Sequence, residues 1–232
     1  MVVAPIFTSQ LALLMYLLKF ILQIYKKTLN SQPKALNFFV SLHQRLYDMD
    51  IAQQKRKENI AEYILYLWQI EDLLRALQFS PEAVYSALVK PRSLDSNTER
   101  MLLAWYMDIA NLLSQEGKEK SGHLDHTLHL ISDLHDLHLR LMQQQEIGEA
   151  YRLRHKMVMQ HLPALRSRLG KESDMNDTEL CFRALYAAML YRIKGNGEQV
   201  VADTIEVISP YIATLTDYFH KVERGEIDLF KE

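Results

Sequence analysis

The sequence is poor in the residues that interrupt helices and in the residue that forms disulfides. Among 232 residues there are only 7 Gly, 6 Pro and one Cys. A β-rich chain of this length would need more turn residues, so the scarcity of helix breakers favours long helices. The single cysteine, Cys181, excludes an intramolecular disulfide and a cysteine-based metal site. We therefore expect a helical chain of the reducing cytoplasm, where disulfides are rare.

Several classes of function lack their usual signature in this chain. The formal net charge is −2, and the only short basic run, Lys55-Arg56-Lys57, is followed at once by Glu58. Nucleic-acid binding by clustered cations is therefore not expected. No glycine-rich phosphate loop, GxSxG elbow or Cys–His nucleophile pattern occurs, so enzyme activity has no support from the sequence, and the cofactor, if there is one, is unknown.

The first 47 residues lack acidic side chains, whereas the rest of the chain carries all 29 of them. An apolar run over 11–25 contains a lysine and is shorter than the roughly 20 apolar residues that span a membrane. A signal peptide would need a positive region before this run and a cleavage site after it. We predict that residues 1–48 are an extension upstream of a true start at Met49. The alternative is an amphipathic helix over residues 6–28 that lies on a membrane surface.

Beyond Met49, apolar residues recur with the helical period, and no alternating run typical of a strand is found. The fold class predicted is all-α, a multi-helix bundle of six or seven helices with mostly antiparallel neighbours, forming a single domain over 49–232 with a short polar tail. Expected helix starts are Ser80-Pro81, Asp95 or Ser96, and Asn176 or Asp177. The predicted helices span 51–79, 81–90, 96–115, 123–145, 149–169 with a kink at Pro163, 178–194, and 198–222 with a new cap or a kink at Ser209-Pro210.

A histidine-rich stretch is the most visible candidate for chemistry. On a helix, four of its side chains fall within about 80° of one face, where they could bind a metal ion. The simpler interpretation is a solvated face opposite a row of leucines, and we favour it. His155 and His161 on the next helix would complete a site if the two helices pack together. The four candidate ligands are His126, His129, Asp133 and Asp136.

Two charged residues lie within the most apolar helical stripes. Glu71 is flanked by leucine and isoleucine positions, and Arg183 lies in the apolar helix 178–194. Because buried charges are costly unless paired, we predict that Glu71 and Arg183, or Arg192, face each other. Such a pair usually fixes helix register, although perturbed pairs also mark functional sites.

Two segments carry a family resemblance. The run KRKENIAEYILYLWQIEDLLRA over 55–76 is similar to the opening helix of an uncharacterised all-helical bacterial family, a domain of unknown function. The later run TELCFRALY over 178–186 is similar to a second marked segment of that family. The resemblance covers about 49–219, and it implies a start near Met49 but no assigned activity.

Protein interaction is the function that the sequence favours. The helices 51–79 and 178–194 are apolar nearly all round, which leaves more apolar surface than one small bundle would cover. We expect a helical interaction or scaffold domain without catalytic activity, which binds another protein or a second copy of itself. The alternatives are a metal- or small-ligand-binding bundle, and a peripheral membrane protein attached through residues 6–28; without that segment, a membrane is not expected as a partner.

Overall fold

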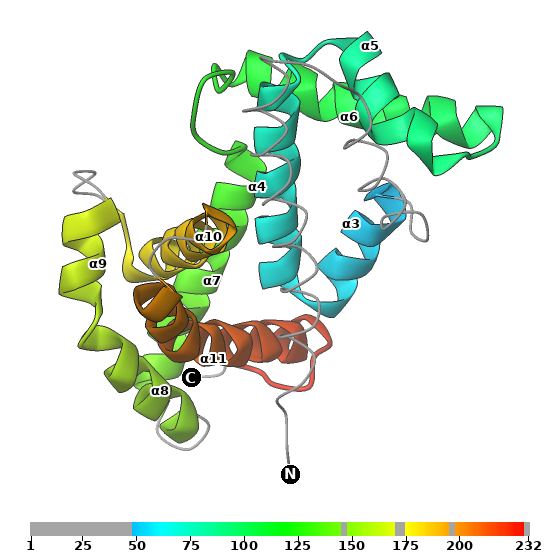
Figure 1. The fold of residues 1–232 in the computed structure, drawn as a ribbon. Coiled ribbons are helices and arrows are strands. Elements are labelled where there is room, and N and C mark those ends of the chain that lie inside the picture. Colours follow the sequence, from blue (N-terminus) through cyan, green and yellow to red (C-terminus); the bar gives the residue numbers. More distant parts are fainter. Residues whose placement is uncertain (1–47, 145–147, 170–174, 195–197, 230–232) are drawn as a thin grey trace. The chain divides into compact units, whose positions relative to one another are not determined.

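In the computed structural model, every regular element over the described residues is a helix, which confirms the all-α class (Figure 1). The structure describes residues 48–144, 148–169, 175–194 and 198–229. The predicted N-terminal extension lies outside these residues except for Asp48. Over the same ranges, no helix combines the length and apolar character needed to cross a bilayer.

Nine α-helices and two short irregular helices occupy the described ranges. The segment after α5 continues as a π turn, η1, and a 3₁₀ turn, η2, before a short connection over 93–95 leads into α6. The bounds are α3 Asp48–Glu58, α4 Ile60–Ala76, α5 Pro81–Val84, η1 Tyr85–Val89, η2 Lys90–Arg92, α6 Ser96–Gln115, α7 Asp125–Gln143, α8 Glu149–Met159, α9 Leu162–Leu169, α10 Asp177–Lys194 and α11 Glu198–Glu223.

The chain divides into two compact units, and three helices contribute to both. Over the described residues, unit 1 comprises 48–53, 68–124 and 189–194, and therefore contains α5 and α6. Unit 2 comprises 54–67, 125–144, 148–169, 175–188 and 198–229, and contains α7, α8, α9 and α11. Helices α3, α4 and α10 each begin in one unit and end in the other. The prediction of a single domain over 49–232 stays a prediction.

Three predicted helix starts are confirmed by their hydrogen bonds. The Ser80 hydroxyl accepts the N–H of Ala83, with proline in the first helical position. The Asp95 carboxylate accepts the N–H groups of the second and third residues that follow it. The Asn176 side chain accepts the N–H of Glu179 at the start of α10. Each satisfies N–H groups that the first helical turn leaves without an intrahelical acceptor.

Two predicted helices are each divided, which raises the number of helices above six or seven. The expected helix 51–79 is interrupted at Asn59, whose side-chain oxygen accepts the N–H groups of Ala61 and Glu62 and so starts α4 anew. The expected kink at Pro163 is a full break at residues 160–161, which places the proline in the first turn of α9. By contrast, α11 passes through Pro210 without interruption.

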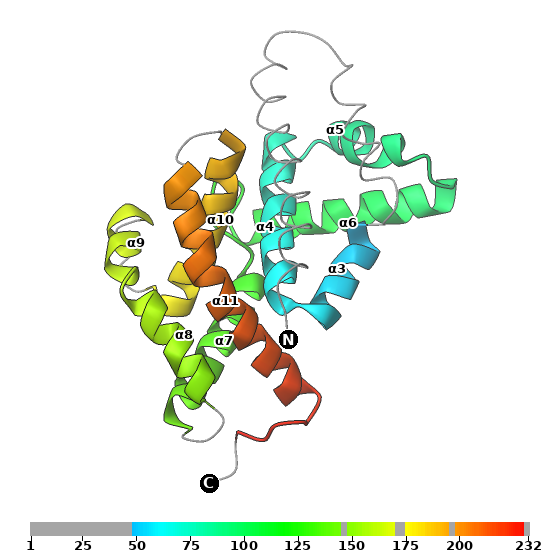
Figure 2. The same ribbon diagram turned by 60° about the horizontal axis from the view of Figure 1, so that its bottom comes forward.

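In unit 1, the core forms where α6 packs against α5 and η1 (Figure 2). The buried residues of α6 recur at helical spacing and include Leu102, Tyr106, Ile109 and Leu113. The buried Arg92 fits into this core because its guanidinium donates to the Leu88 carbonyl at 2.7 Å and to the Tyr106 hydroxyl at 3.3 Å.

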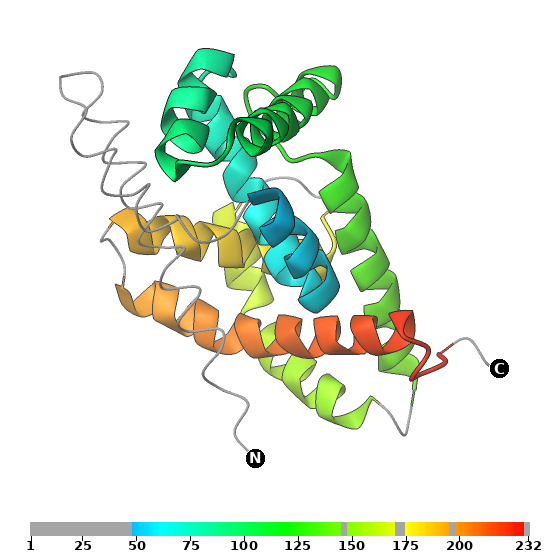
Figure 3. The same cartoon turned by 90° about the vertical axis from the view of Figure 1, so that its right-hand side faces the viewer.

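In unit 2, helices α7, α8 and α11 pack against one another pairwise (Figure 3). Their facing sides are apolar, with a few polar side chains among them. Helix α7 buries one continuous side, and α8 buries Tyr151 and Val158. The buried residues of α11 include Ile208, Tyr211, Ile212, Leu215 and Thr216.

Gly148 permits the close approach that begins α8. A Cβ atom added there would meet the backbone oxygens of Leu141 and Gln144, the latter at 2.9 Å. Backbone oxygens cannot move aside as a side-chain end can, so the start of α8 would have to shift away from α7.

We expect Gly148→Ala to lower the free energy of unfolding by about 2–3 kcal/mol, the usual effect of overpacking. Urea unfolding followed by circular dichroism measures this change. Gly117→Ala, whose Cβ would have no neighbour within 4 Å but whose φ of +67° adds backbone strain, is expected to cost less, about 1 kcal/mol.

Candidate functional site

Helix α8 has an apolar stripe on its exposed side as well as on its buried side. Ala150, Leu153 and Met157 are exposed, and the last two retain 64% and 57% of their accessible surface. Their spacing of three and four residues places them along one line of the helix. Tyr151 and Val158 face the interior instead. We call Ala150, Leu153 and Met157 the α8 stripe.

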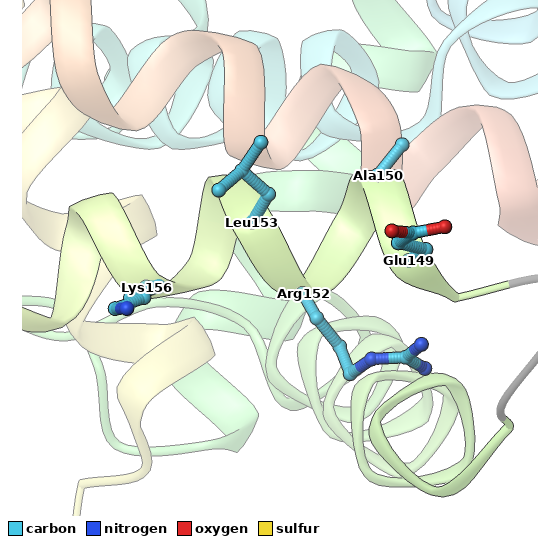
Figure 4. A pocket seen from close by; sticks show the side chains of 5 residues that line it. All are labelled: Glu149, Ala150, Arg152, Leu153 and Lys156. Carbon is cyan, nitrogen blue, oxygen red and sulfur yellow. The ribbon is translucent and has the colours of Figure 1, made fainter.

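Two exposed basic residues flank the α8 stripe. Arg154 and Lys156 are exposed, whereas Arg152 donates a hydrogen bond to the carbonyl of Gln144. Over 149–169 the sequence has five Arg or Lys and one Glu, so this segment is strongly positive in a chain of net charge −2. A shallow depression lies beside the α8 stripe, and Ala150 and Leu153 of the stripe contribute to its lining (Figure 4). The residues that line it are Glu149, Ala150, Arg152, Leu153 and Lys156.

The buried side of α8 contributes to a polar cluster inside unit 2, which we call the His138 cluster. Nδ1 of His138 lies 2.7 Å from the Tyr151 hydroxyl and 3.3 Å from the Tyr211 hydroxyl. The Tyr151 hydroxyl donates to that of Tyr211 at 3.0 Å. Tyr211 also bonds to Thr178, whose hydroxyl lies 3.1 Å from Nδ1 of His135. The members are His135, His138, Tyr151, His155, Thr178 and Tyr211.

His155 joins the His138 cluster through ring contact. Its imidazole centroid lies 4.6 Å from that of His138 and 5.7 Å from that of Tyr211. Its Nε2 atom is buried and has no hydrogen-bond partner in the described part of the chain. The packing of α7 against α8 thus brings together a histidine of each helix, His138 and His155, neither of which is among the four proposed metal ligands.

Burial keeps His138, His155 and the two tyrosines uncharged at neutral pH. Burial, reinforced by His155 and His135, lowers the pKa of His138 from 6.5 to about 4, against a smaller opposing effect of Asp177. Burial also lowers the pKa of His155. It raises the pKa of both tyrosines and of the nearby Cys181 thiol far above neutrality. Because a thiol reacts as its thiolate, Cys181 is not an activated nucleophile.

A second buried constellation lies in unit 1 around Glu71, whose side chain has no exposed area. Its carboxylate accepts the N–H of Leu124 at 3.2 Å, and its other oxygen lies 2.8 Å from Nδ1 of His123. The His123 ring stacks on Trp68 with a centroid distance of 3.8 Å. Arg75 approaches the carboxylate to 3.9 Å and donates to the Gly122 carbonyl. Glu71 therefore fixes the segment that leads into α7.

The predicted partner of Glu71 is placed in the other unit. Arg183 is half-buried and forms an ion pair with Glu179, one turn earlier on α10, at 2.8 Å. The predicted pair between Glu71 and Arg183 stays a prediction.

The four proposed metal ligands lie on the exposed side of α7. His126, His129, Asp133 and Asp136 are all exposed, and Nε2 of His126 lies 3.1 Å from the Tyr63 hydroxyl. Across the described residues, no three His, Cys, Asp or Glu side chains converge so that they could hold a metal ion. Exposure of all four is what the solvated-face interpretation expects.

Comparison with protein families identifies the chain at the level of its domain. The features assembled above define an all-helical domain with a buried polar cluster in each unit and an exposed apolar stripe on one helix. The chain belongs to the family described as a domain of unknown function, DUF4924, whose model matches residues 49–226. The resemblance seen in the sequence is thus confirmed over nearly the same range. No curated protein and no solved structure matches the chain.

Proposed function

We propose that this chain is a cytoplasmic protein-binding domain and that the α8 stripe is its binding surface. The observation that carries the proposal is the exposure of Leu153 and Met157, one turn apart, on a helix whose opposite side is already buried. The lone cysteine supports the reducing compartment.

The arrangement of these residues distinguishes the α8 stripe from ordinary surface apolar residues. Single exposed leucines and methionines are common and need no explanation. Here, three apolar side chains follow one line of a helix that is fixed by its packing on α7 and α11. Because the helix that carries the stripe is rigid, little conformational entropy is lost on binding, which favours affinity. Methionine also adapts its shape to a partner surface.

The charge around the α8 stripe favours an acidic partner. Arg154 and Lys156 flank the stripe, and the segment 149–169 has a net charge of +4 when histidines are neutral. An amphipathic helix of the partner, with large apolar residues on one side and Asp or Glu beside them, would match both the apolar stripe and the cations that flank it. A symmetric pair of copies would bring the same cations together, which disfavours self-association through α8.

We expect removal of the apolar side chains of the α8 stripe to abolish most of the binding. Leu153→Gln with Met157→Gln should weaken the affinity for the partner by about 30-fold or more, since two buried anchors typically contribute 1–2 kcal/mol each. The matched control is Met101→Gln with Leu112→Gln, which changes two exposed apolar residues of α6. This control should change the affinity less than about twofold.

The measurement is isothermal titration of the purified chain with the protein that co-purifies from its own cells. Arg154→Glu with Lys156→Glu should reduce the affinity further at low salt than at high salt, because screening weakens the charge contribution. Equal affinity of the wild type and the Leu153/Met157 variant would contradict the proposal. Dimerisation through α8, seen by sedimentation, would replace the acidic partner with a second copy.

A further inference from the structure

A continuous set of polar contacts links four helices inside unit 2. It starts at His138 on α7, passes through Tyr151 on α8 and Tyr211 on α11, and reaches Thr178 at the start of α10. From there it returns to α7 at His135. Most buried helix contacts in this unit are apolar, so this set is the polar exception on the side of α8 that faces the core.

The burial of His138 and His155 favours the neutral form of both side chains. Nδ1 of His138 lies within hydrogen-bonding range of two phenol groups, and His138 retains 5% of its accessible surface. The His155 ring lies directly beside it, with its Nε2 buried and with no partner in the described residues. Two imidazolium ions at this separation would repel each other, and either alone would lose its hydration.

The groups that face His138 provide little compensation for a positive charge. On α8 these are Tyr151 and His155, and on α11 the facing group is Tyr211. His135 lies one turn away on the same helix. On α10, Cys181 remains a neutral thiol, and Asp177 favours the charge, but it already accepts a hydrogen bond from Arg166 at 2.6 Å.

We propose that the His138 cluster is a pH-sensitive contact that holds α8 against α7 and α11 at neutral pH and releases α8 in mild acid. The sign follows from the lowered pKa of His138. In the unfolded or released chain, the imidazole takes a proton near pH 6.5, whereas in the packed state it does so only near pH 4. The stabilising effect is therefore complete above pH 6.5 and decreases as the pH falls toward 4. This inference does not depend on the proposed binding partner.

Cys181 provides a direct measurement of the release. It is the only cysteine, has no exposed area, and adjoins the two tyrosines of the cluster. The rate at which an aromatic disulfide reagent modifies it is compared with the rate in the urea-unfolded chain at the same pH. The ratio of the rate in the unfolded chain to the rate in the folded chain gives the protection of Cys181. The intrinsic pH dependence of thiol reactivity cancels in this ratio, because both rates are measured at the same pH.

We expect this protection to decrease roughly tenfold between pH 7 and pH 5 in the wild type, as the difference in pKa implies after allowance for partial solvent screening. In His138→Gln, whose amide can still bond to Tyr151 but does not titrate, most of this dependence should disappear. The matched control, His126→Gln, alters an exposed histidine of the same helix and should behave as the wild type. Trp68 and Trp105 lie in unit 1, so unchanged tryptophan fluorescence at pH 5 separates local release from global unfolding.

The proposal is overturned if wild-type protection is the same at pH 7 and pH 5, or if His138→Gln retains the wild-type dependence. Should that variant fail to fold, the nuclear magnetic resonance titration of the wild-type imidazoles decides instead. A His138 resonance that titrates near pH 6.5 in the folded chain would contradict the proposal, and one that stays neutral below pH 5 would support it.

Discussion

Replacing Glu71 with alanine is expected to lower the free energy of unfolding by about 3–4 kcal/mol, the usual effect of removing one partner from a buried charged network. The Leu124 N–H would lose its carboxylate acceptor, and His123 and Arg75 would lose the anion they approach. Because Glu71 holds the segment that precedes α7, the effect extends beyond its own contacts. Glu71→Gln keeps one oxygen acceptor and should cost less, about 1–2 kcal/mol.

Urea unfolding followed by tryptophan fluorescence measures this change in the free energy of unfolding. Trp68 reports on the surroundings of Glu71 because its ring stacks on that of His123. The control is Glu62→Ala, which removes a half-buried carboxylate that pairs with Lys55. We expect it to change the free energy of unfolding by less than about 1 kcal/mol. A Glu71→Ala variant no less stable than Glu62→Ala would show that the buried carboxylate does not fix the segment before α7.

Tyr151→Ala is expected to destabilise the chain by about 3–5 kcal/mol, which is the range for truncating a buried aromatic residue. Tyr151 has no exposed area and its ring contacts those of His138, Tyr211 and Tyr218. Tyr151→Phe separates packing from hydrogen bonding. It removes only the hydroxyl that joins His138 to Tyr211, at an expected cost of about 1–2 kcal/mol.

Chemical unfolding followed by circular dichroism provides the comparison, because neither tryptophan lies in unit 2. Tyr85→Phe is a suitable control, since its hydroxyl donates to Glu99 at a half-buried position of unit 1. Its expected cost is below about 1 kcal/mol. If Tyr151→Phe and Tyr85→Phe were equally stable, the hydroxyl of Tyr151 would contribute no more than the half-buried hydroxyl of Tyr85 does.

The sequence predicted the helices best where capping chemistry is local. Ser80, Asp95 or Ser96, and Asn176 or Asp177 are predictable as caps because such side chains accept N–H groups of the following turn. The break at Asn59 was missed because apolar residues continue across it with an almost helical period, while asparagine is tolerated within helices. The sequence around Pro210 is compatible with either a new helix start or a kink. In the structure, α11 is packed in its tertiary context as one uninterrupted helix through Pro210.

The candidate sites were harder to predict, since they depend on which helices pack together. Burial of Glu71 could be expected from its apolar neighbours, but its contacts come from the segment before α7, which no local pattern connects to it. The spacing of the histidine stretch indicates a possible site on its exposed face, whereas His138 on the opposite face contacts His155 of α8. The cations of 149–169 were overlooked because they are spaced out instead of forming a run.

Helix α8 connects the two proposals. Its exposed side carries Leu153 and Met157, and its buried side carries Tyr151 and His155. If the His138 cluster releases α8 in mild acid, the stripe loses the rigid support that favours binding. Binding would then be stronger at neutral pH than near pH 5, although either proposal can hold without the other.

Site-specific photo-crosslinking in the native cells tests the central claim most directly. A photoreactive amino acid is placed at position 153 on the α8 stripe, or at position 112 on α6 as the control. We predict a covalent adduct from position 153 to an acidic amphipathic segment of another protein, and none from position 112. No adduct from position 153, or the same adduct from both positions, would contradict the proposal that the α8 stripe is the binding surface.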